Sequence, residues 1–155
     1  MTPETRAKLD AADVEGWYVP NDDWAQFPYQ AYQAEVEKVK QQIKSELGVE
    51  LKKNGNIQDA SYFEELLLLS SDRRMRVCIM FSSFGKLYTI WSSFAEPPEN
   101  LSDFDVPSMR SIAESHGWPY IPVGELRAVY DGRYADRMQP SAFTVTWLLR
   151  FFSYV

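Results

Sequence analysis

Few residues in this chain are of the types that carry out acid–base, nucleophilic or metal chemistry. The 155 residues include a single histidine, His116, and a single cysteine, Cys78. A typical zinc site takes three or four nitrogen or sulfur ligands, so this composition excludes one. Cys78 lies between Val77 and Ile79, a position typical of a buried and unreactive thiol. His116 falls where a helix is expected to end, and the helix dipole favours a cation there.

The carboxylates and glycines do not supply a catalytic motif either. Glu64 and Glu65 are adjacent on an expected strand, so their side chains point to opposite faces and do not form a pair. The glycines form neither the GxGxxG nor the GxxxxGKS/T phosphate-binding pattern. Acids around residue 100 could bind a hard cation together, but their spacing is not that of an EF-hand loop. We therefore expect no enzymatic activity, no cofactor and no metal site.

Length and composition indicate one folded domain. With 45% hydrophobic and 15% aromatic residues, the chain can form a packed core and is not expected to be disordered. Lys and Arg number 16 against 22 Asp and Glu, and the net charge of −6 argues against binding to a nucleic-acid backbone. Such a charge can attract a basic partner, or can simply keep a small domain soluble.

The chain carries no recognisable signal for export or membrane insertion. Residues 1–8 lack the apolar core of a signal peptide, and no apolar run approaches the roughly 20 residues that a membrane span needs. The lone cysteine cannot form an intramolecular disulfide, which fits a reducing compartment. We therefore expect a cytoplasmic protein that contacts neither membrane nor nucleic acid.

The stretch from Glu65 to Ala95 is the centre of the expected fold, because it holds alternating apolar runs separated by turns. Upstream of it, Asn54-Gly55 is a strong signal for a two-residue hairpin. Sequential strands usually lie side by side, so the pattern predicts a four-stranded antiparallel β-meander. Its strands are expected at residues 49–53, 56–69, 75–82 and 87–95.

Helical patterns flank this sheet. Between Pro28 and Gly48, apolar residues recur every three or four positions, which predicts a long amphipathic helix lying on a core. Its expected apolar stripe is Tyr29, Tyr32, Val36, Val39, Ile43 and Leu47. Shorter helices are expected from Asp105 or Pro107 to Gly117, over residues 123–130 and over residues 142–155, although Thr144, Val145 and Thr146 would also suit a strand.

The predicted fold is therefore a single α+β domain spanning residues 1–155. Its four-stranded antiparallel β-meander is covered by a long N-terminal amphipathic helix and by C-terminal helices. Residues 1–24 are expected to form an irregular N-terminal segment strapped on the core, within which Thr2 and Pro3 are typical of the start of a short helix.

The best candidate for recognition is the loop from Tyr130 to Arg137, which mixes Tyr, Arg and Asp. These residue types are common at binding surfaces. The alternative is a loop whose Tyr rings pack on the domain and whose charges pair locally. Together with the acidic loop before it, this stretch supplies the candidate contacts with a protein partner: Glu96, Glu99, Asp103, Asp105, Tyr130, Asp131, Tyr134 and Asp136.

The last third of the chain resembles the end of small bacterial immunity proteins, the cognate inhibitors of polymorphic or contact-dependent growth-inhibition toxins. The resemblance is carried by Ile121–Leu126, Val129–Gly132 and Thr144–Tyr154. It implies a cytoplasmic, non-enzymatic, often acidic α+β protein that binds and neutralises a toxin domain. The acidic charge makes a basic nuclease domain one such partner.

Two other functions fit the same sequence. A small-ligand or enzymatic domain could use a pocket between the sheet and the long helix, lined by Tyr62, Tyr88 and Trp91, with Glu64 or Glu65 as an acid or base. A chaperone, an adaptor or a homodimer could instead use the aromatic C-terminal segment as its interface.

Overall fold

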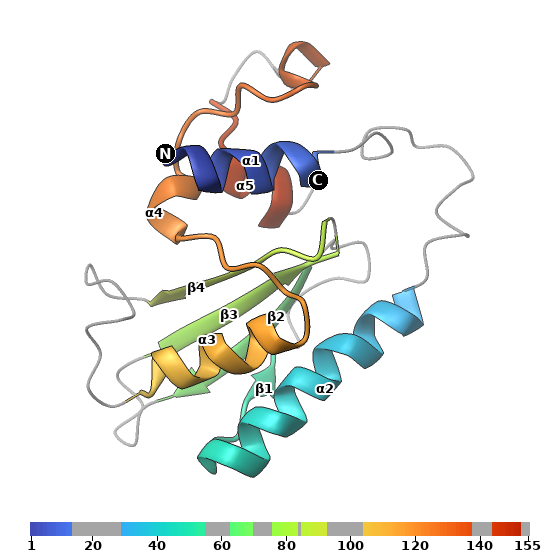
Figure 1. The fold of residues 1–155 in the computed structure, drawn as a ribbon, viewed down its shortest axis with the longest axis vertical. Coiled ribbons are helices and arrows are strands. Elements are labelled where there is room, and N and C mark those ends of the chain that lie inside the picture. Colours follow the sequence, from blue (N-terminus) through green and yellow to red (C-terminus); the bar gives the residue numbers. More distant parts are fainter. Residues whose placement is uncertain are drawn as a thin grey trace.

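The computed structural model describes residues 1–13, 29–54, 63–69, 76–83, 85–92, 104–137 and 144–152. Figure 1 shows the arrangement of the elements. The elements are α1 (Pro3–Ala12), α2 (Tyr29–Leu47), β1 (Lys52–Lys53), β2 (Phe63–Leu69), β3 (Arg76–Ser82), β4 (Tyr88–Ser92), α3 (Val106–Ser115), α4 (Val123–Leu126), the 3₁₀ helix η3 (Ala135–Arg137) and α5 (Trp147–Phe152).

The sheet confirms the predicted meander. Its strands are antiparallel and lie in the order β1-β2-β3-β4. The register between β2 and β3 runs from Phe63 opposite Ser82 to Leu69 opposite Arg76. The β3–β4 turn places Gly85 and Lys86 at positive φ, which matches the turn predicted there.

The predicted two-residue hairpin at Asn54-Gly55 is wrong. Lys53 pairs with Leu66, and the Asn54 N–H donates to the Glu65 carbonyl, whereas a tight turn would pair Lys53 with Asn56. The register of β1 on β2 agrees with the hydrophobic pattern of β2, because Leu66 lies in the core that α2 covers. Gly55 and the first part of the strand expected over residues 56–69, residues 56–62, lie outside the described residues.

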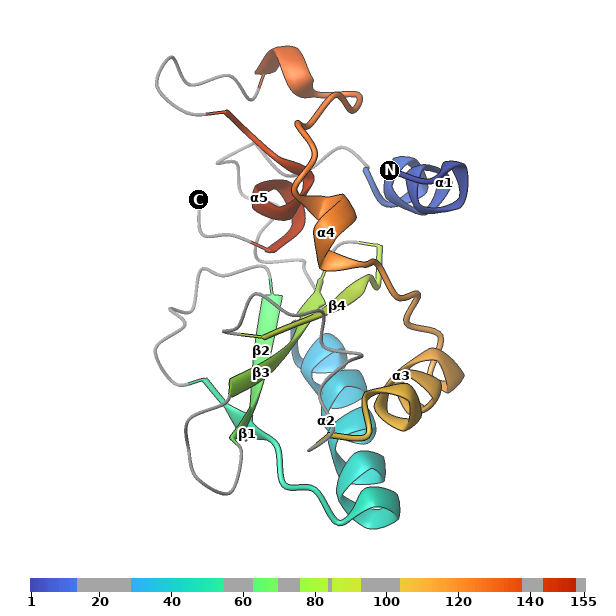
Figure 2. The ribbon, with the colours of Figure 1, turned by 90° about the vertical axis from the view of Figure 1, so that its left-hand side faces the viewer.

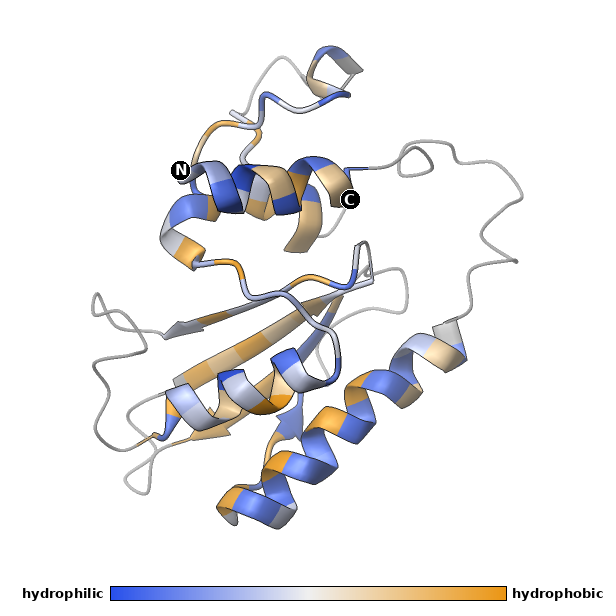
Figure 3. Cartoon of the chain, in the orientation of Figure 1, coloured by the Kyte–Doolittle hydropathy of each residue, from blue (hydrophilic) through white to orange (hydrophobic). Residues whose placement is uncertain are grey.

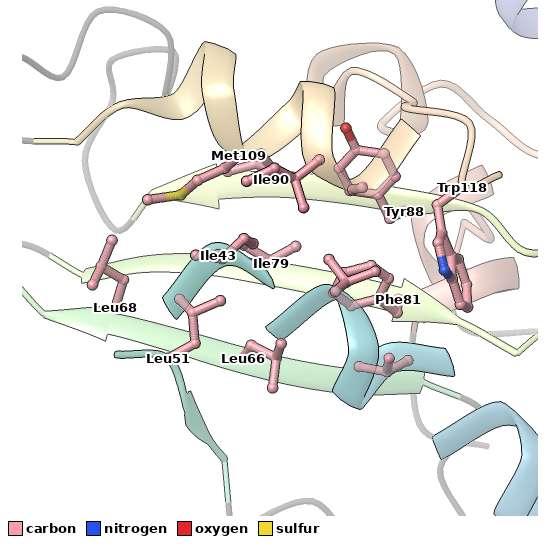
Figure 4. Packing of buried hydrophobic residues seen from close by; sticks show 14 of the residues in the cluster. Ile43, Leu51, Leu66, Leu68, Ile79, Phe81, Tyr88, Ile90, Met109 and Trp118 are labelled. Atoms are coloured by element: carbon pink, nitrogen blue, oxygen red, sulfur yellow. The ribbon is translucent and has the colours of Figure 1, made fainter. Parts of the chain in front are cut away.

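One face of the sheet is covered by α2 and α3 (Figure 1). Figure 4 shows the side chains of this first core, in which Ile43 of α2 and Met109 of α3 meet the apolar side of the strands. Val77, Ile79 and Phe81 of β3 all lie in this first core, because alternate side chains of a strand point to the same face. The apolar stripe of α2 is confirmed at Tyr32, Val36, Val39 and Ile43, and Figure 3 shows hydrophobic residues recurring along this helix among hydrophilic ones.

The predicted long N-terminal helix needs correction. The helix at the N-terminus is the ten-residue α1, whose first turn is capped by the Thr2 hydroxyl accepting from the Thr5 N–H. The long amphipathic helix is the second one, α2. Residues 14–24 of the segment expected to cross the core lie outside the described residues.

A second core joins α1, α4 and α5, which Figures 1 and 2 show grouped beyond one end of the sheet. Leu9 and Ala12 of α1 are buried in it, and Met80 of β3 reaches it from the sheet face opposite α2. Gly85 lies against α1, because a Cβ at Gly85 would come 2.2 Å from the Ala12 Cβ. This close approach seats the end of α1 on the β3–β4 turn.

The C-terminal region combines the two structures that the sequence left open. Only Val123–Leu126 of the expected 123–130 helix is helical, and Val129 instead forms an isolated antiparallel bridge with Thr146. The residues suited to a strand lie beside that bridge, and helix α5 begins directly after them. Helix α3 matches the prediction, with Asp105 as its N-cap and Gly117 at a φ of +79° after its end.

Candidate functional site

The loop predicted for recognition is held from beneath by a buried ion pair. Asp13, directly after α1, and Arg150 of α5 lie 2.6 Å apart between Oδ1 and Nη2, and each side chain is 1% exposed. The Arg150 Nε also donates to the same oxygen at 2.8 Å. A buried carboxylate and guanidinium in this two-donor arrangement fix each other's orientation. The pair therefore joins the end of the first helix to the last helix.

The second oxygen of Asp13 binds the loop itself. Its Oδ2 accepts from the Tyr130 hydroxyl at 2.6 Å and from the Arg133 N–H at 3.0 Å. The Tyr130 oxygen in turn accepts from the Tyr134 N–H at 3.1 Å. One carboxylate thus fixes the backbone of residues 130–134 through direct and relayed hydrogen bonds.

Tyr130 lies below the surface on which it was expected to contact a partner. It is 5% exposed, and its ring stands edge-on to Trp147 with the ring centroids 4.7 Å apart. Burial, together with the hydrogen bond to Asp13, raises the pKa of Tyr130 to about 12. This residue shapes the loop, and its ring is not available for a contact from outside.

Gly132 is required by the packing of this loop. A Cβ there would lie 2.5 Å from the Asp13 Oδ2, 2.5 Å from the Tyr130 Cε2 and 2.8 Å from the Trp147 Cη2. Only a residue without a side chain allows the turn to close over the buried ion pair.

The outer side of the loop and the first turn of α5 expose a mixed surface. Val129 is 61% exposed and Leu149 42% exposed, although both are apolar. They flank Thr146, which bridges Val129 and accepts from the Leu149 N–H at 3.3 Å. We name this area the α5 surface; its exposed members are Val129, Asp131, Arg133, Asp136 and Leu149. Tyr134 is half-buried in the same loop, with its ring centre 5.6 Å from the guanidinium of the buried Arg150.

An exposed ion pair ties the α5 surface to α1. The Arg6 Nη1 lies 2.7 Å from the Asp131 Oδ1, and the Arg6 Nε donates to Asp10 on its own helix. The hydrogen bond from Arg6 holds the pKa of the Asp131 carboxyl below its ordinary value. The Arg6 guanidinium also lies 5.3 Å from the centre of the Trp147 ring. Asp131 is therefore exposed and also held in a fixed place.

The remaining predicted contacts fall elsewhere. Asp105 accepts from the Ser108 N–H at 3.1 Å. Hydrogen bonds from the Ser108 side chain and from this N–H lower the pKa of the Asp105 carboxyl. Asp105 begins α3, which Figure 1 places beside the sheet and away from α5. Asp131, Tyr134 and Asp136 thus share one loop, and Asp105 lies apart from them. Glu96, Glu99 and Asp103 lie outside the described residues.

The residues expected to line a ligand pocket do not converge. Tyr88 and Trp91 are three positions apart on β4, so Tyr88 lies in the first core and Trp91 packs against the second. Glu64 and Glu65 point to opposite faces as predicted: Glu64 accepts from Gln33 of α2, whereas Glu65 accepts from the Asn54 side chain. Tyr62 lies outside the described residues.

The cysteine and the histidine, the two residue types most often used in catalysis and metal binding, lie in ordinary structural contacts here. Cys78 is buried, as predicted. The His116 Nε2 lies 2.6 Å from the Gln42 Oε1 at the end of α3. Within the described ranges, His, Cys, Asp and Glu side chains form no group of three or more that could hold a metal ion. No helix in that same part of the chain combines the length and hydropathy needed to cross a membrane.

The sequence contains one signal for the buried ion pair. Arg150 interrupts the apolar run Trp147–Phe152, and a lone charge in such a run is typical of a buried group with a partner. The partner, Asp13, could not be found in this way, because it is one of many acids.

Comparison of the chain with protein families, with curated proteins and with solved structures finds no match.

Proposed function

We propose that this chain is a non-enzymatic binding protein of the immunity-protein kind, which neutralises a cognate bacterial toxin domain by direct contact through the α5 surface. The observation that supports it is the combination of exposed apolar side chains with a rigidly held loop. Val129 and Leu149 are exposed on either side of Thr146, while Asp13 and Arg150 hold the loop that follows Val129.

Such an arrangement favours tight protein binding for a physical reason. Association costs free energy whenever a loop or a long side chain must be ordered, and a loop already fixed by a buried carboxylate avoids much of that cost. Exposed apolar side chains such as Val129 and Leu149 can supply the apolar core of an interface. The acidic groups around them, and the net charge of −6, favour a basic partner and a fast encounter.

The experiment uses the product of the reading frame next to the gene for this chain. Its C-terminal domain is purified, its toxicity is measured with and without the chain, and the affinity is measured by calorimetry. We expect a stable complex and loss of toxicity. A neighbouring frame that encodes no toxin, together with no binding to any toxin domain tested, would overturn the proposal.

Leu149 and Leu69 provide a matched pair for locating the contact. They are 42% and 45% exposed, so their replacement by alanine removes equal apolar surface with little effect on folding. Because a partner that covers Leu149 removes its apolar side chain from water, L149A is expected to weaken the affinity at least about tenfold. L69A, at the end of β2, is expected to leave it unchanged. Equal effects of the two substitutions would place the contact elsewhere.

A further inference from the structure

A groove lies between helix α2 and the β1–β2 edge of the sheet, on the sheet face that α2 covers. Figure 1 shows where these elements lie. Its volume is about 340 Å³, at the lower end of the range for small-molecule sites. The residues that matter for its chemistry are Gln33, Val36, Lys40, Lys53, Glu64 and Leu66.

The charge that is fixed in this groove is negative. The Glu64 side chain is only 6% exposed, whereas that of Lys53 is 49% exposed and that of Lys40 is 26% exposed. The backbone of Glu64 is also held in place, because its N–H donates to the buried Tyr32 hydroxyl at 3.0 Å. The two lysines can swing toward solvent, but the carboxylate cannot leave.

The contacts of Glu64 show which group the site accepts. Its Oε1 accepts from the Lys53 Nζ at 2.8 Å and from the Gln33 Nε2 at 3.1 Å. The Lys53 side chain, an ammonium on an aliphatic stem, therefore already pairs with this carboxylate. The buried side chains of Val36 and Leu66, which line the same groove, offer apolar surface to such a stem.

From these contacts we infer that the groove binds an alkyl-ammonium group, with Glu64 as the binding anion and Lys53 as a displaceable resident. An anionic ligand is disfavoured, because it would have to approach a carboxylate that cannot move away. The ammonium can come from a free amine or from a lysine side chain of a peptide or protein. This inference does not depend on the α5 surface, which lies elsewhere on the molecule.

The test is a titration of the ¹⁵N-labelled full chain followed by backbone amide shifts. The probes are n-butylamine, N-acetyl-lysine methylamide, the uncharged N-acetyl-norleucine methylamide, and sodium acetate. We expect the two amines to shift the amides of Gln33, Lys53 and Glu64, while the uncharged and anionic probes leave them in place. Tighter binding of butylamine identifies a free amine as the source, and tighter binding of the lysine derivative identifies a lysine side chain; either supports the inference.

Two substitutions with neighbouring controls decide the roles of the charges. K53M removes the resident ammonium, so it is expected to tighten amine binding by about tenfold, whereas K52M, at the adjacent exposed position of β1, should not. E64Q should weaken amine binding by about tenfold, and the exposed E46Q should have no effect.

Three results would each overturn the inference. The first is a shift of the groove amides by acetate and not by the amines. The second is the absence of any shift in the groove with either amine. The third is equal amine affinity in K53M and K52M, which would mean that Lys53 and Glu64 only support the fold. L149A, which tests the proposed function, is expected to leave amine binding unchanged, so failure of either proposal is seen separately.

Discussion

Asp13 and Arg150 are 137 residues apart in the chain, yet they form an ion pair in which both side chains are 1% exposed. The pair joins the end of α1 to α5, and the same carboxylate accepts from the loop between them. Replacing such a pair by apolar groups is often neutral, but removing one partner leaves a buried charge without its counter-ion. The position of the loop therefore depends on both α1 and α5.

We predict that D13N and R150M each destabilise the protein by about 3–5 kcal/mol, because each leaves the other charge buried and unpaired. The free energy of unfolding is measured by urea denaturation at neutral pH. The double variant D13N/R150M removes both charges but keeps an oxygen that can accept from Tyr130 and Arg133, so it is expected to recover most of the loss. Single variants that cost less than about 1 kcal/mol would mean that the pair can be solvated where it stands.

The elements that the sequence predicted well are those whose signal is local. Val77, Ile79 and Phe81 alternate within one strand, and the stripe of α2 repeats within one helix, so neither needs knowledge of a distant segment. The order of the sheet followed because its strands are consecutive.

The features that the sequence missed are set by distant contacts. The pairing of Lys53 with Leu66 depends on which leucines face α2, and the Asn-Gly signal contains no information about that. Tyr130 belongs to a stretch of the correct type for binding, but its direction is decided by Asp13, 117 residues earlier. The same contact explains why a loop rich in Tyr, Arg and Asp keeps one tyrosine inside and its acids outside.

Gly132 and Gly124 allow a direct test of the packing over the ion pair. G132A is expected to destabilise by about 1–3 kcal/mol, because its Cβ would overlap Asp13, Tyr130 and Trp147. G124A has no atom within 4 Å of the new Cβ and lies in helix α4, so it should be neutral or stabilising by up to about 1 kcal/mol. Thermal and urea unfolding measure both. Equal stability of the two variants would contradict the close packing seen at Gly132.

Tyr130 should make stability depend on pH in the alkaline range. Its pKa is raised to about 12 in the fold by burial and by Asp13, against about 10 in an unfolded chain. The folded state therefore holds this proton more tightly, and its contribution is complete below about pH 10 and is lost as pH rises toward about 12. Urea unfolding across this range should show a steeper loss of stability in the wild-type chain than in Y130F.

Y130F has a second, separable effect, because it also removes a donor from Asp13. We expect its stability at neutral pH to be lower by about 1–2 kcal/mol. The slope with pH, not the value at one pH, therefore tests the raised pKa. Parallel curves for the wild-type chain and Y130F above about pH 10 would show that Tyr130 ionises as it does in an unfolded chain.

Asp131 should show the opposite dependence, at acidic pH. Arg6 holds the pKa of this carboxyl below its ordinary value, so the stabilisation is present above about pH 4 and is lost as pH falls through the folded pKa. Both side chains are solvent-accessible, so the effect on stability is at most about 1 kcal/mol. A carboxyl NMR titration is more sensitive: the Asp131 pKa should rise in R6Q, which removes the largest cause of its lowering, and stay low in K8Q, which removes a neighbouring cation paired with Glu4. An Asp131 pKa that is the same in R6Q and in the wild-type chain would show that the α5 surface is not tied to α1 by this pair.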